Sequence, residues 1–159
     1  MDHPPLAIRE ADEKDFDEIL KIGELSWEVW GRPSRRDLEK MIVKHPGGLM
    51  VGLYGSRIIG FSSGYPTPPV IEKMLGRASV EPDKMSCYHV EYLAVHPDYR
   101  DNHVDGLLLE KQHERARGLG HEIVFLHALR SMRDYYEKQG YQSEGSLDGN
   151  FKNLFWRKL

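Results

Sequence analysis

Apolar and polar positions follow two periods along this chain, one typical of strands and one typical of helices. Alternating or continuous short apolar runs predict strands at 6–9, 49–54, 58–65, 88–96, 123–126, 141–144 and 151–157. Apolar residues spaced three or four apart predict helices at 13–25, 34–45, 104–117 and 132–139. Helices inserted between strands in this order predict a mixed α/β (α+β) fold. Its central mixed sheet would have about six to seven strands and helices on both faces.

Local capping and turn signals support these boundaries. Three pairs have the Ser/Asp-x-x-acid spacing that caps a helix N-terminus, and we expect each to do so: Asp12 with Asp15, Ser34 with Asp37, and Ser131 with Asp134. Gly55-Ser56 separates two predicted strands and predicts a two-residue hairpin turn, because glycine adopts positive φ without strain.

One segment, 66–86, lacks a clear pattern apart from a weak helical stretch at 70–75. We expect a long surface loop there, and loops of that length tend to be functional or mobile. The chain contains no repeat, linker or low-complexity tract. The sequence therefore predicts a single domain over residues 1–159.

Composition narrows the class of protein. The chain has 159 residues, of which 40% are hydrophobic and 10% aromatic, so it can bury a sizeable core. A net charge of −3 without a basic run argues against nucleic acid as a partner. We expect no membrane span, because no apolar run approaches about 20 residues, and the N-terminus does not resemble a signal peptide. Cys87 is the single cysteine, so no internal disulfide forms, which fits a cytoplasmic location.

The most strongly patterned segment spans residues 88–106. Residues 88–96 are mostly aromatic, β-branched or apolar, with Glu91 as their only acid, and predict a buried strand. Pro97 ends the strand, and helical spacing begins at Val104. A strand, short loop and helix N-terminus place backbone N–H groups and the positive end of a helix dipole together, which favours anion binding.

This segment resembles the cofactor-binding motif of the GNAT superfamily, the acyl-CoA-dependent N-acetyltransferases. In that motif a strand ends in Leu-x-Val-x-Pro-x-Tyr-Arg and a glycine-containing loop leads into a helix. The matching residues are Leu93, Val95, Pro97, Tyr99 and Arg100. His103 and Asp105 stand where the family has glycine.

A second segment, residues 135–141, resembles the family's aromatic-Tyr-Glu-Lys-x-Gly-aromatic stretch. The predicted order of elements is also similar to that of the GNAT fold. The two motifs and the element order together cover essentially the whole chain, so the resemblance implies a GNAT-like fold.

The resemblance implies that acetyl-CoA is the cofactor and that no metal takes part. The pantetheine arm would pair with the main chain of Leu93, Ala94 and Val95, and Ser131 would add a polar contact. The pyrophosphate would lie against the loop and first helical turn formed by Arg100, Asp101, Asn102, His103, Val104, Asp105 and Gly106.

Two candidate catalytic residues follow from the same resemblance. Tyr136 occupies the position of the family's proton-donating tyrosine and would protonate the departing thiolate; the alternative is a packing role, which we expect for Tyr135. Glu91 would accept the amine proton through ordered water, because a carboxylate in a buried strand is costly unless it is paired or used. The alternative for Glu91 is a salt-bridged or exposed acid.

The acceptor pocket is less well defined by sequence. Trp27, Trp30 and Tyr65 are candidates to line it, although they fit an ordinary aromatic core equally well. His89 shares one strand face with Glu91 by alternation, and would either relay a proton or pack. Cys87 lacks neighbours that would activate it as a nucleophile.

We therefore expect an N-acetyltransferase that moves an acetyl group from acetyl-CoA to a primary amine, on a small molecule or a peptide N-terminus, by direct transfer. Members of such families often form homodimers, so a homodimer is a further expectation. The alternative is a non-catalytic GNAT-like interaction module whose coenzyme A binding is weakened by His103 and Asp105.

Overall fold

The computed structural model describes residues 3–27, 31–77, 81, 84–144 and 152–159. The chain folds into two compact units. Unit 1 contains residues 1–64 and 92–112, and unit 2 contains residues 65–91 and 113–159. Each unit has its own core and is described by itself. The single domain over residues 1–159 stays a prediction.

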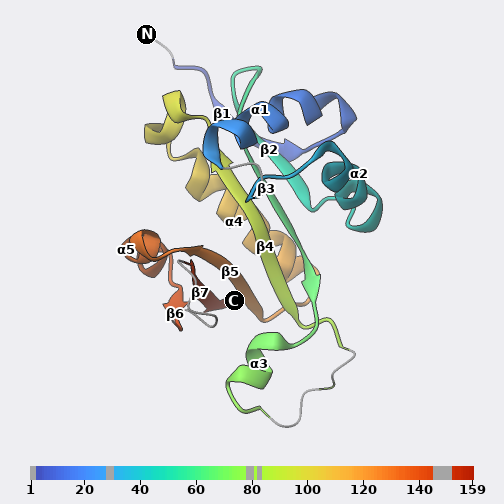
Figure 1. Ribbon diagram of the computed structural model, residues 1–159, viewed down its shortest axis with the longest axis vertical. Helices are drawn as coiled ribbons and strands as arrows, with labels where there is room; N and C mark the ends of the chain where they lie inside the picture. The colour runs from blue at the N-terminus through green and yellow to red at the C-terminus, as the bar shows by residue number, and fades with distance from the viewer. Residues whose placement is uncertain (1–2, 28–30, 78–80, 82–83, 145–151) are drawn as a thin grey trace. The chain divides into compact units, whose positions relative to one another are not determined.

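The secondary structure follows the predicted order (Figure 1). The strands are β1 (Leu6–Glu10), β2 (Leu49–Tyr54), β3 (Arg57–Thr67), β4 (Cys87–Val95), β5 (Ile123–Leu129), β6 (Gln142–Ser143) and β7 (Lys152–Lys158). The α-helices are α1 (Phe16–Ser26), α2 (Arg35–Lys44), α3 (Val70–Met74), α4 (Val104–Gly118) and α5 (Arg133–Lys138). Short 3₁₀ turns are η1 (Glu13–Asp15), η3 (Pro97–Asn102) and η4 (Arg130–Met132).

The described strands form one seven-stranded sheet in the order β1-β2-β3-β4-β5-β7-β6. β4 and β5 run parallel, whereas β1–β2, β2–β3, β5–β7 and β6–β7 are antiparallel pairs. The predicted mixed sheet is therefore confirmed. The predicted hairpin turn is also confirmed, since Gly55 joins β2 to β3 with φ 62°.

Unit 1 has helices on both faces of its strands. Alternate residues of β2 and β3 point to opposite sides. On one side, Val51 and Phe61 share a core cluster with Phe16 and Ile19 of α1 and Leu38 of α2. On the other side, a second cluster joins the strands to the start of α4, and consists of Met50, Ile59, Val95, Val104 and Leu108. Helices on both faces are thus confirmed within this unit.

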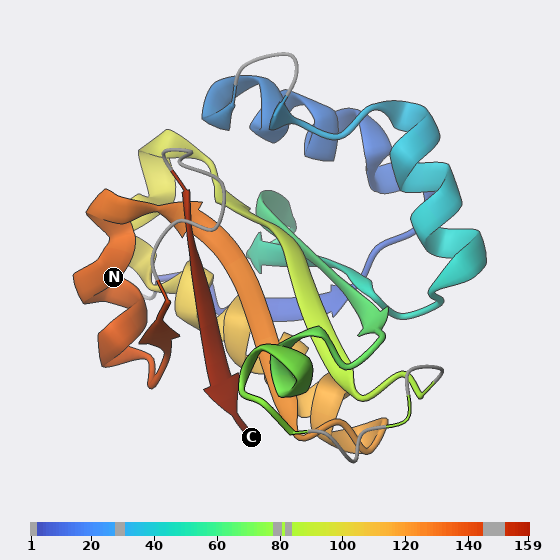
Figure 2. The ribbon, with the colours of Figure 1, turned by 60° about the horizontal axis from the view of Figure 1, so that its bottom comes forward.

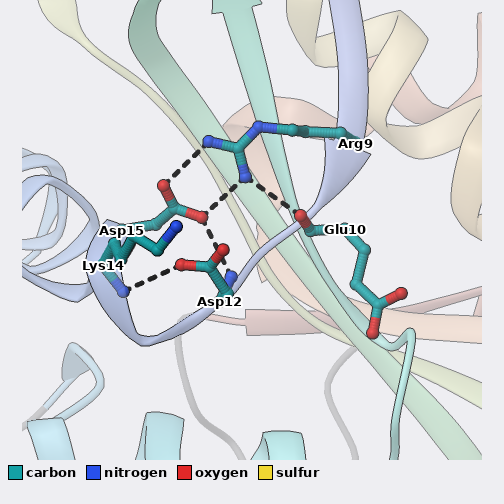
Figure 3. A network of polar contacts seen from close by, with 5 residues as sticks. All are labelled: Arg9, Glu10, Asp12, Lys14 and Asp15. Atoms are coloured by element: carbon teal, nitrogen blue, oxygen red, sulfur yellow. Dashed lines mark hydrogen bonds and ion pairs between the residues drawn. The ribbon is translucent and has the colours of Figure 1, made fainter.

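The entry into α1 is held by an ion pair (Figure 3). The guanidinium of Arg9 donates to both carboxylate oxygens of Asp15, at 2.7 and 2.8 Å. Asp15 also accepts from the backbone N–H of Asp12, whose side chain caps Lys14. Because Asp15 accepts these bonds, above all the one from Arg9, its pKa lies below the ordinary value. The capping pairs predicted at Asp12 and Ser34 are confirmed.

Unit 2 places α3 against the face formed by β4, β5 and β7 (Figure 2). Its core cluster contains Ile71, Cys87, Ile123, Phe125, Leu154 and Trp156. Ile71 and Glu72 of α3 are buried, and Glu72 accepts from Ser86 Oγ at 2.9 Å and Cys87 Sγ at 3.0 Å. The weak helical stretch predicted at 70–75 is confirmed as α3. The prediction that 66–86 is a surface loop was wrong for this helix, because its apolar and acidic residues pack on partners distant in sequence.

The other face of unit 2 carries α5. Tyr136 of α5 packs against Phe155 of β7, with ring centroids 5.2 Å apart. The predicted cap by Ser131 was wrong: Ser131 lies inside η4, Met132 precedes α5, and no side chain caps the helix. In the part of the chain that the structure describes, no helix is both long and apolar enough to cross a membrane.

Candidate functional site

The predicted pyrophosphate loop joins β4 to α4 in unit 1. β4 ends at Val95, η3 follows, and His103 adopts the left-handed conformation with φ 59° and ψ 17° before α4 begins at Val104. His103 is the only described non-glycine residue with positive φ. Glycine is the residue that takes this conformation without strain. The loop therefore keeps a glycine-like backbone shape at a position where the family has glycine.

Two glycines seat the first turn of α4 on the strands. A Cβ on Gly52 of β2 would lie 2.6 Å from Cγ2 of Val104. A Cβ on Gly60 of β3 would lie 2.9 Å from the carbonyl oxygen of Ala94 and 3.2 Å from Cδ1 of Leu108. The distances of 2.6 and 2.9 Å are too short for a Cβ unless a neighbouring atom moves, and the distance of 3.2 Å is tight. The absence of side chains at these positions thus sets where the helix N-terminus lies.

The first turn of α4 is open at Gly106. A Cβ added at Gly106 would meet no atom within 4 Å. Arg100 and Asp101 are exposed, and Asn102 is half-buried. The first turn of an α-helix directs its N–H groups outward along the axis, where they bind anions. The residues therefore fit a pyrophosphate group held by backbone N–H groups, with Arg100 nearby.

Side chains on the neighbouring strands hold the loop in shape. Arg57 of β3 donates to Tyr99 Oη at 3.0 Å and lies over its ring, 5.2 Å from the centroid. His96 Nδ1 accepts from the backbone N–H of Asp98 at 3.1 Å. The backbone N–H of His96 donates to the carbonyl of Ile59 at 2.7 Å. The loop is thus tied to β3 by contacts at His96 and Tyr99.

The residues predicted to hold the pantetheine arm lie at the end of β4. Leu93 and Val95 belong to the cluster beside α4, whereas Ala94 faces the cluster beside α1 and α2. Their side chains therefore pack in the core, which leaves the main chain for recognition. Ser131, the polar contact predicted for the same arm, is exposed in unit 2.

The β4–β5 ladder is short. It pairs Cys87 with Ile123, Tyr88 with Val124, and His89 with Phe125, although β4 continues to Val95 and β5 to Leu129. Two parallel strands that stop pairing midway leave their remaining main-chain groups for other partners. Glu91 follows the last paired residue of β4 by two positions.

Three predicted residues come together in unit 2: Tyr65, His89 and Glu91. Tyr65 Oη lies 3.1 Å from Nδ1 of His89. Burial, with a smaller effect of the nearby charge of Glu91, raises the pKa of Tyr65 to about 12. Burial, with a smaller effect of His127, lowers the pKa of His89 to about 4. Near neutral pH this cluster therefore contains a neutral phenol, a neutral imidazole and one carboxylate.

The ring of His89 is fixed by aromatic neighbours. It stacks on Phe125 with centroids 4.6 Å apart and an interplanar angle of 7°, and meets His127 edge-on at 5.8 Å. Glu91 itself is exposed, so the premise that it lies buried in its strand was wrong. The carboxylate instead lies where solvent and a ligand can reach it.

Tyr136 is buried, with 6% of its surface exposed, and is more buried than Tyr135. Its ring meets Tyr135 at 5.0 Å, Tyr141 at 5.6 Å and Phe155 at 5.2 Å. In the β5–β7 ladder, Phe125 pairs with Trp156, so Phe155 faces the opposite side of the sheet from Phe125. Tyr136 and the His89 cluster therefore lie on opposite faces in unit 2.

The predicted acceptor residues of the first helices are only partly described. Trp27 is half-buried and packs edge-on against Phe61 at 6.1 Å and against Tyr92 at 5.6 Å. It thus contacts β4 directly before Leu93. Trp30 lies outside the described residues.

A cavity of about 660 Å³ in unit 1 contains none of the predicted site residues. Its lining comes from α1, the β2–β3 turn and the end of β4, and consists of Glu18, Lys21, Ile22, Glu24, Leu25, Ser56, Arg57, Ile58 and His96. Among the described residues, no cluster of histidine, cysteine, aspartate and glutamate is arranged to hold a metal ion.

Sequence reasoning missed several residues that shape the site. Gly52 carried a usable signal, because an isolated glycine within a strand indicates a close backbone approach. His127 and Phe125 carried none, since only the fold brings them to His89. For Cys87, burial raises the pKa of the thiol to about 12, which disfavours the reactive thiolate near neutral pH.

Comparison with known proteins identifies the family of the chain. A model of the acetyltransferase (GNAT) family matches residues 7–141. Among curated proteins, no sequence match was found.

Solved structures share the fold at low sequence identity. Ard1 from Thermoplasma volcanium is 17% identical, with a TM-score of 0.77 over 97% of each chain. PaiA N-acetyltransferase from Thermoplasma acidophilum, in complex with coenzyme A, is 16% identical, with a TM-score of 0.73 over 98% of this chain and 99% of that one. N-acetylglutamate synthase from Neisseria gonorrhoeae, complexed with coenzyme A and N-acetyl-glutamate, is 19% identical, with a TM-score of 0.75 over 98% of this chain and 35% of that one. The family match covers most of the sequence, and the chain therefore belongs to the GNAT family of acetyltransferases.

Proposed function

We propose that this protein is an acetyl-CoA-dependent N-acetyltransferase that acts on a primary amine by direct transfer. The observation that carries the proposal is the loop from β4 to α4. It has a left-handed residue at His103 and an open first turn at Gly106, which together fit a pyrophosphate. Coenzyme A is present in structures of PaiA N-acetyltransferase and N-acetylglutamate synthase, which share the fold.

Acetyl-CoA supplies the acetyl group as a thioester; the amine nitrogen forms the new C–N bond as the C–S bond breaks. The chain's residues supply the proton transfers. The amine must lose a proton before it attacks, and the exposed carboxylate of Glu91 both attracts an ammonium group and accepts that proton through water. His89 and Tyr65 lie near this carboxylate and are both neutral near pH 7, so neither would compete with it for the amine.

Tyr136 is the proposed proton donor to the departing thiolate. A phenol with an ordinary pKa near ~10 remains protonated at neutral pH and can protonate a thiolate. Its burial against Phe155 and Tyr141 keeps the ring in one orientation. Trp27, Trp30, Tyr65 and His89 are proposed to line the acceptor side.

The acceptor is proposed to be a small primary amine or a peptide N-terminus. Structural neighbours of the same fold include agmatine N-acetyltransferase and the NatC complex bound to a peptide and coenzyme A. We propose a cytoplasmic location and a homodimer on the basis of family resemblance alone.

A second candidate is a non-catalytic interaction module with weakened coenzyme A binding. The observation that favours it is Asp105, whose carboxylate lies in the first turn of α4. A negative charge there stabilises the helix N-terminus but repels a pyrophosphate.

A screen for acetyl transfer tests the enzyme directly. Released coenzyme A thiol would be measured with acetyl-CoA and agmatine, spermidine, L-glutamate or a short peptide with a free N-terminus. We expect turnover with at least one amine, and a fall of 10-fold or more in kcat for both Glu91→Gln and Tyr136→Phe. Acetyl-CoA affinity should change less than threefold in Tyr136→Phe. If the wild-type protein turns over none of these amines, the proposal that it is an N-acetyltransferase is contradicted.

A further inference from the structure

A buried hydrogen-bond network of His113, Tyr141 and Arg157 connects three segments of unit 2 near Tyr136. His113 of α4 is 1% exposed. Its Nε2 lies 2.6 Å from Tyr141 Oη, and its Nδ1 lies 3.3 Å from Nη1 of Arg157 on β7. The same Nη1 donates to the carbonyl of Gln139 at 3.0 Å. The network therefore extends from α4 through β7 to the turn that follows α5.

The donors and acceptors in this network define the tautomer of His113. A guanidinium can only donate, so Nδ1 of His113 accepts from Arg157. Nε2 then carries the imidazole hydrogen and donates it to Tyr141 Oη. A neutral His113 with this tautomer satisfies both buried neighbours, whereas a protonated His113 would place a donor against Arg157.

The turn contacted by this network is hydrogen-bonded to the backbone of Tyr136. The N–H groups of Gln139 and Tyr141 both donate to the carbonyl of Tyr136 at 3.0 Å. Gly140 between them has φ 87°, and a Cβ there would lie 3.2 Å from Nε of Arg157. The turn 139–141 is thus closed over the Arg157 guanidinium.

The same network also contacts the ring of Tyr136. Tyr141 meets it edge-on at 5.6 Å. The ring also contacts Phe155, which shares one face of β7 with Arg157 by alternation. Both the main chain and the side chain of Tyr136 therefore depend on residues of this network.

We propose that Arg157, His113 and Tyr141 are positioning residues that hold Tyr136 in the orientation its proton transfer needs. This inference rests on the proposed function, because Tyr136 is the proton donor there. General acid catalysis requires the donor to lie within hydrogen-bond distance of the group it protonates, so a small rotation of the ring lowers the rate. None of the three residues touches the reacting groups in this account.

Tyr141→Phe is the most direct test, because it removes one hydroxyl and keeps the ring and the backbone N–H. Tyr88→Phe is the matched control. Tyr88 is fully buried in the same unit, and its hydroxyl accepts from Arg115 of α4 at 2.7 Å. Both variants thus lose a buried phenol bonded to a side chain of one helix, and only the first belongs to the network.

The first measurement needs no substrate. The ¹³Cζ resonance of Tyr136 and amide hydrogen exchange at Gln139 would be recorded by NMR below the unfolding temperature. We expect Tyr141→Phe to shift the resonance and to speed the exchange by at least 10-fold. In Tyr88→Phe the resonance should keep its position and the exchange rate should stay within twofold of the wild-type rate. Equal effects in the two variants, or none in Tyr141→Phe, would overturn the proposal. Arg157→Lys, which should give a smaller shift of the same resonance, replaces Tyr141→Phe if that variant does not fold.

The kinetic measurement is a double-mutant cycle with the most active amine of the screen. We expect Tyr141→Phe to lower kcat 5-fold or more with little change in KM, and to have no further effect on kcat when combined with Tyr136→Phe. The same loss in both backgrounds would contradict positioning through Tyr136. If Tyr136→Phe alone leaves kcat unchanged, the proposed proton donor is wrong, while the NMR result still decides whether the network orients that ring.

Discussion

Gly52 of β2 faces Val104, the first residue of α4, so closely that a Cβ on Gly52 would lie 2.6 Å from Cγ2 of Val104. The fold fixes both residues of the contact: Gly52 lies in a paired strand, and Val104 is fully buried. The helix N-terminus that would hold the pyrophosphate thus depends on the absence of one methyl group.

Gly52→Ala should disturb both stability and cofactor binding. The added methyl overpacks the strand–helix contact, which typically costs about 1–3 kcal/mol in the free energy of unfolding. Because α4 must shift, acetyl-CoA affinity should also fall by at least threefold. Chemical denaturation and calorimetric titration measure the two effects. Gly118→Ala is the control, since a Cβ there meets no atom within 4 Å and should leave affinity unchanged. Unaltered stability and affinity in Gly52→Ala would contradict this reading of the contact.

His103→Gly should make the protein more stable. His103 has φ 59°, and a left-handed residue with a Cβ costs roughly 1–2 kcal/mol, more than the roughly 0.5–1 kcal/mol of chain entropy that glycine adds. The expected gain in the free energy of unfolding is up to about 1 kcal/mol. Asn102→Gly, one residue earlier without positive φ, should instead lose stability. If both variants lose stability equally, the backbone of His103 is not strained.

Asp15→Asn should weaken unit 1 most clearly near neutral pH. The pKa of Asp15 is lowered in the folded state, chiefly by Arg9, so its contribution is present above the unfolded value of about 3.9 and is lost as pH falls through the folded pKa. We expect a loss of about 1–2 kcal/mol at pH 7 that shrinks below pH 4. Denaturant unfolding at several pH values measures it, with the exposed Glu13→Gln as control. A loss that is the same at pH 7 and pH 3 would contradict the ion pair.

His89 predicts a second pH dependence with its own window. Its folded pKa is lowered from 6.5 to about 4, so the unfolded state binds the proton first and stability falls as pH drops from about 6.5 toward 4. The full effect is about 3 kcal/mol for one group. His89→Gln, which cannot titrate, should flatten the stability profile in that window, whereas His3→Gln near the N-terminus should not. An unchanged slope in His89→Gln would show that His89 titrates as it does in the unfolded chain.

The sequence predicted the elements whose signals are local. The caps at Asp12 and Ser34 form because each side chain bonds to a backbone N–H within three residues. Ser131 has the same spacing with Asp134, but the 3₁₀ turn η4 places it before the true helix start, so pattern alone was insufficient. The short helix α3 was underestimated for a related reason, since Glu72 is held by Ser86 and Cys87.

The candidate site was predictable in its positions and not in its contacts. The loop from β4 to α4 was found because its motif is continuous in sequence, and Tyr65 was paired with His89 only by the fold. Glu91 was expected to be buried because its neighbours are apolar, yet it is exposed although alternation puts it on the same strand face as the buried Cys87. The network around His113 joins residues up to 44 positions apart, a distance at which single-sequence patterns carry no signal.

Calorimetric titration of the protein and of Gly106→Ala with acetyl-CoA, at two salt concentrations, tests the proposed cofactor site most directly. We expect micromolar binding to the wild-type protein that weakens at higher salt, because the pyrophosphate is held by the open first turn of α4. In Gly106→Ala, stability should not fall, since the new Cβ meets no atom of the protein within 4 Å, whereas affinity should fall several-fold because the Cβ would occupy space proposed for the phosphate. No binding at millimolar acetyl-CoA would contradict the enzyme and favour the interaction module.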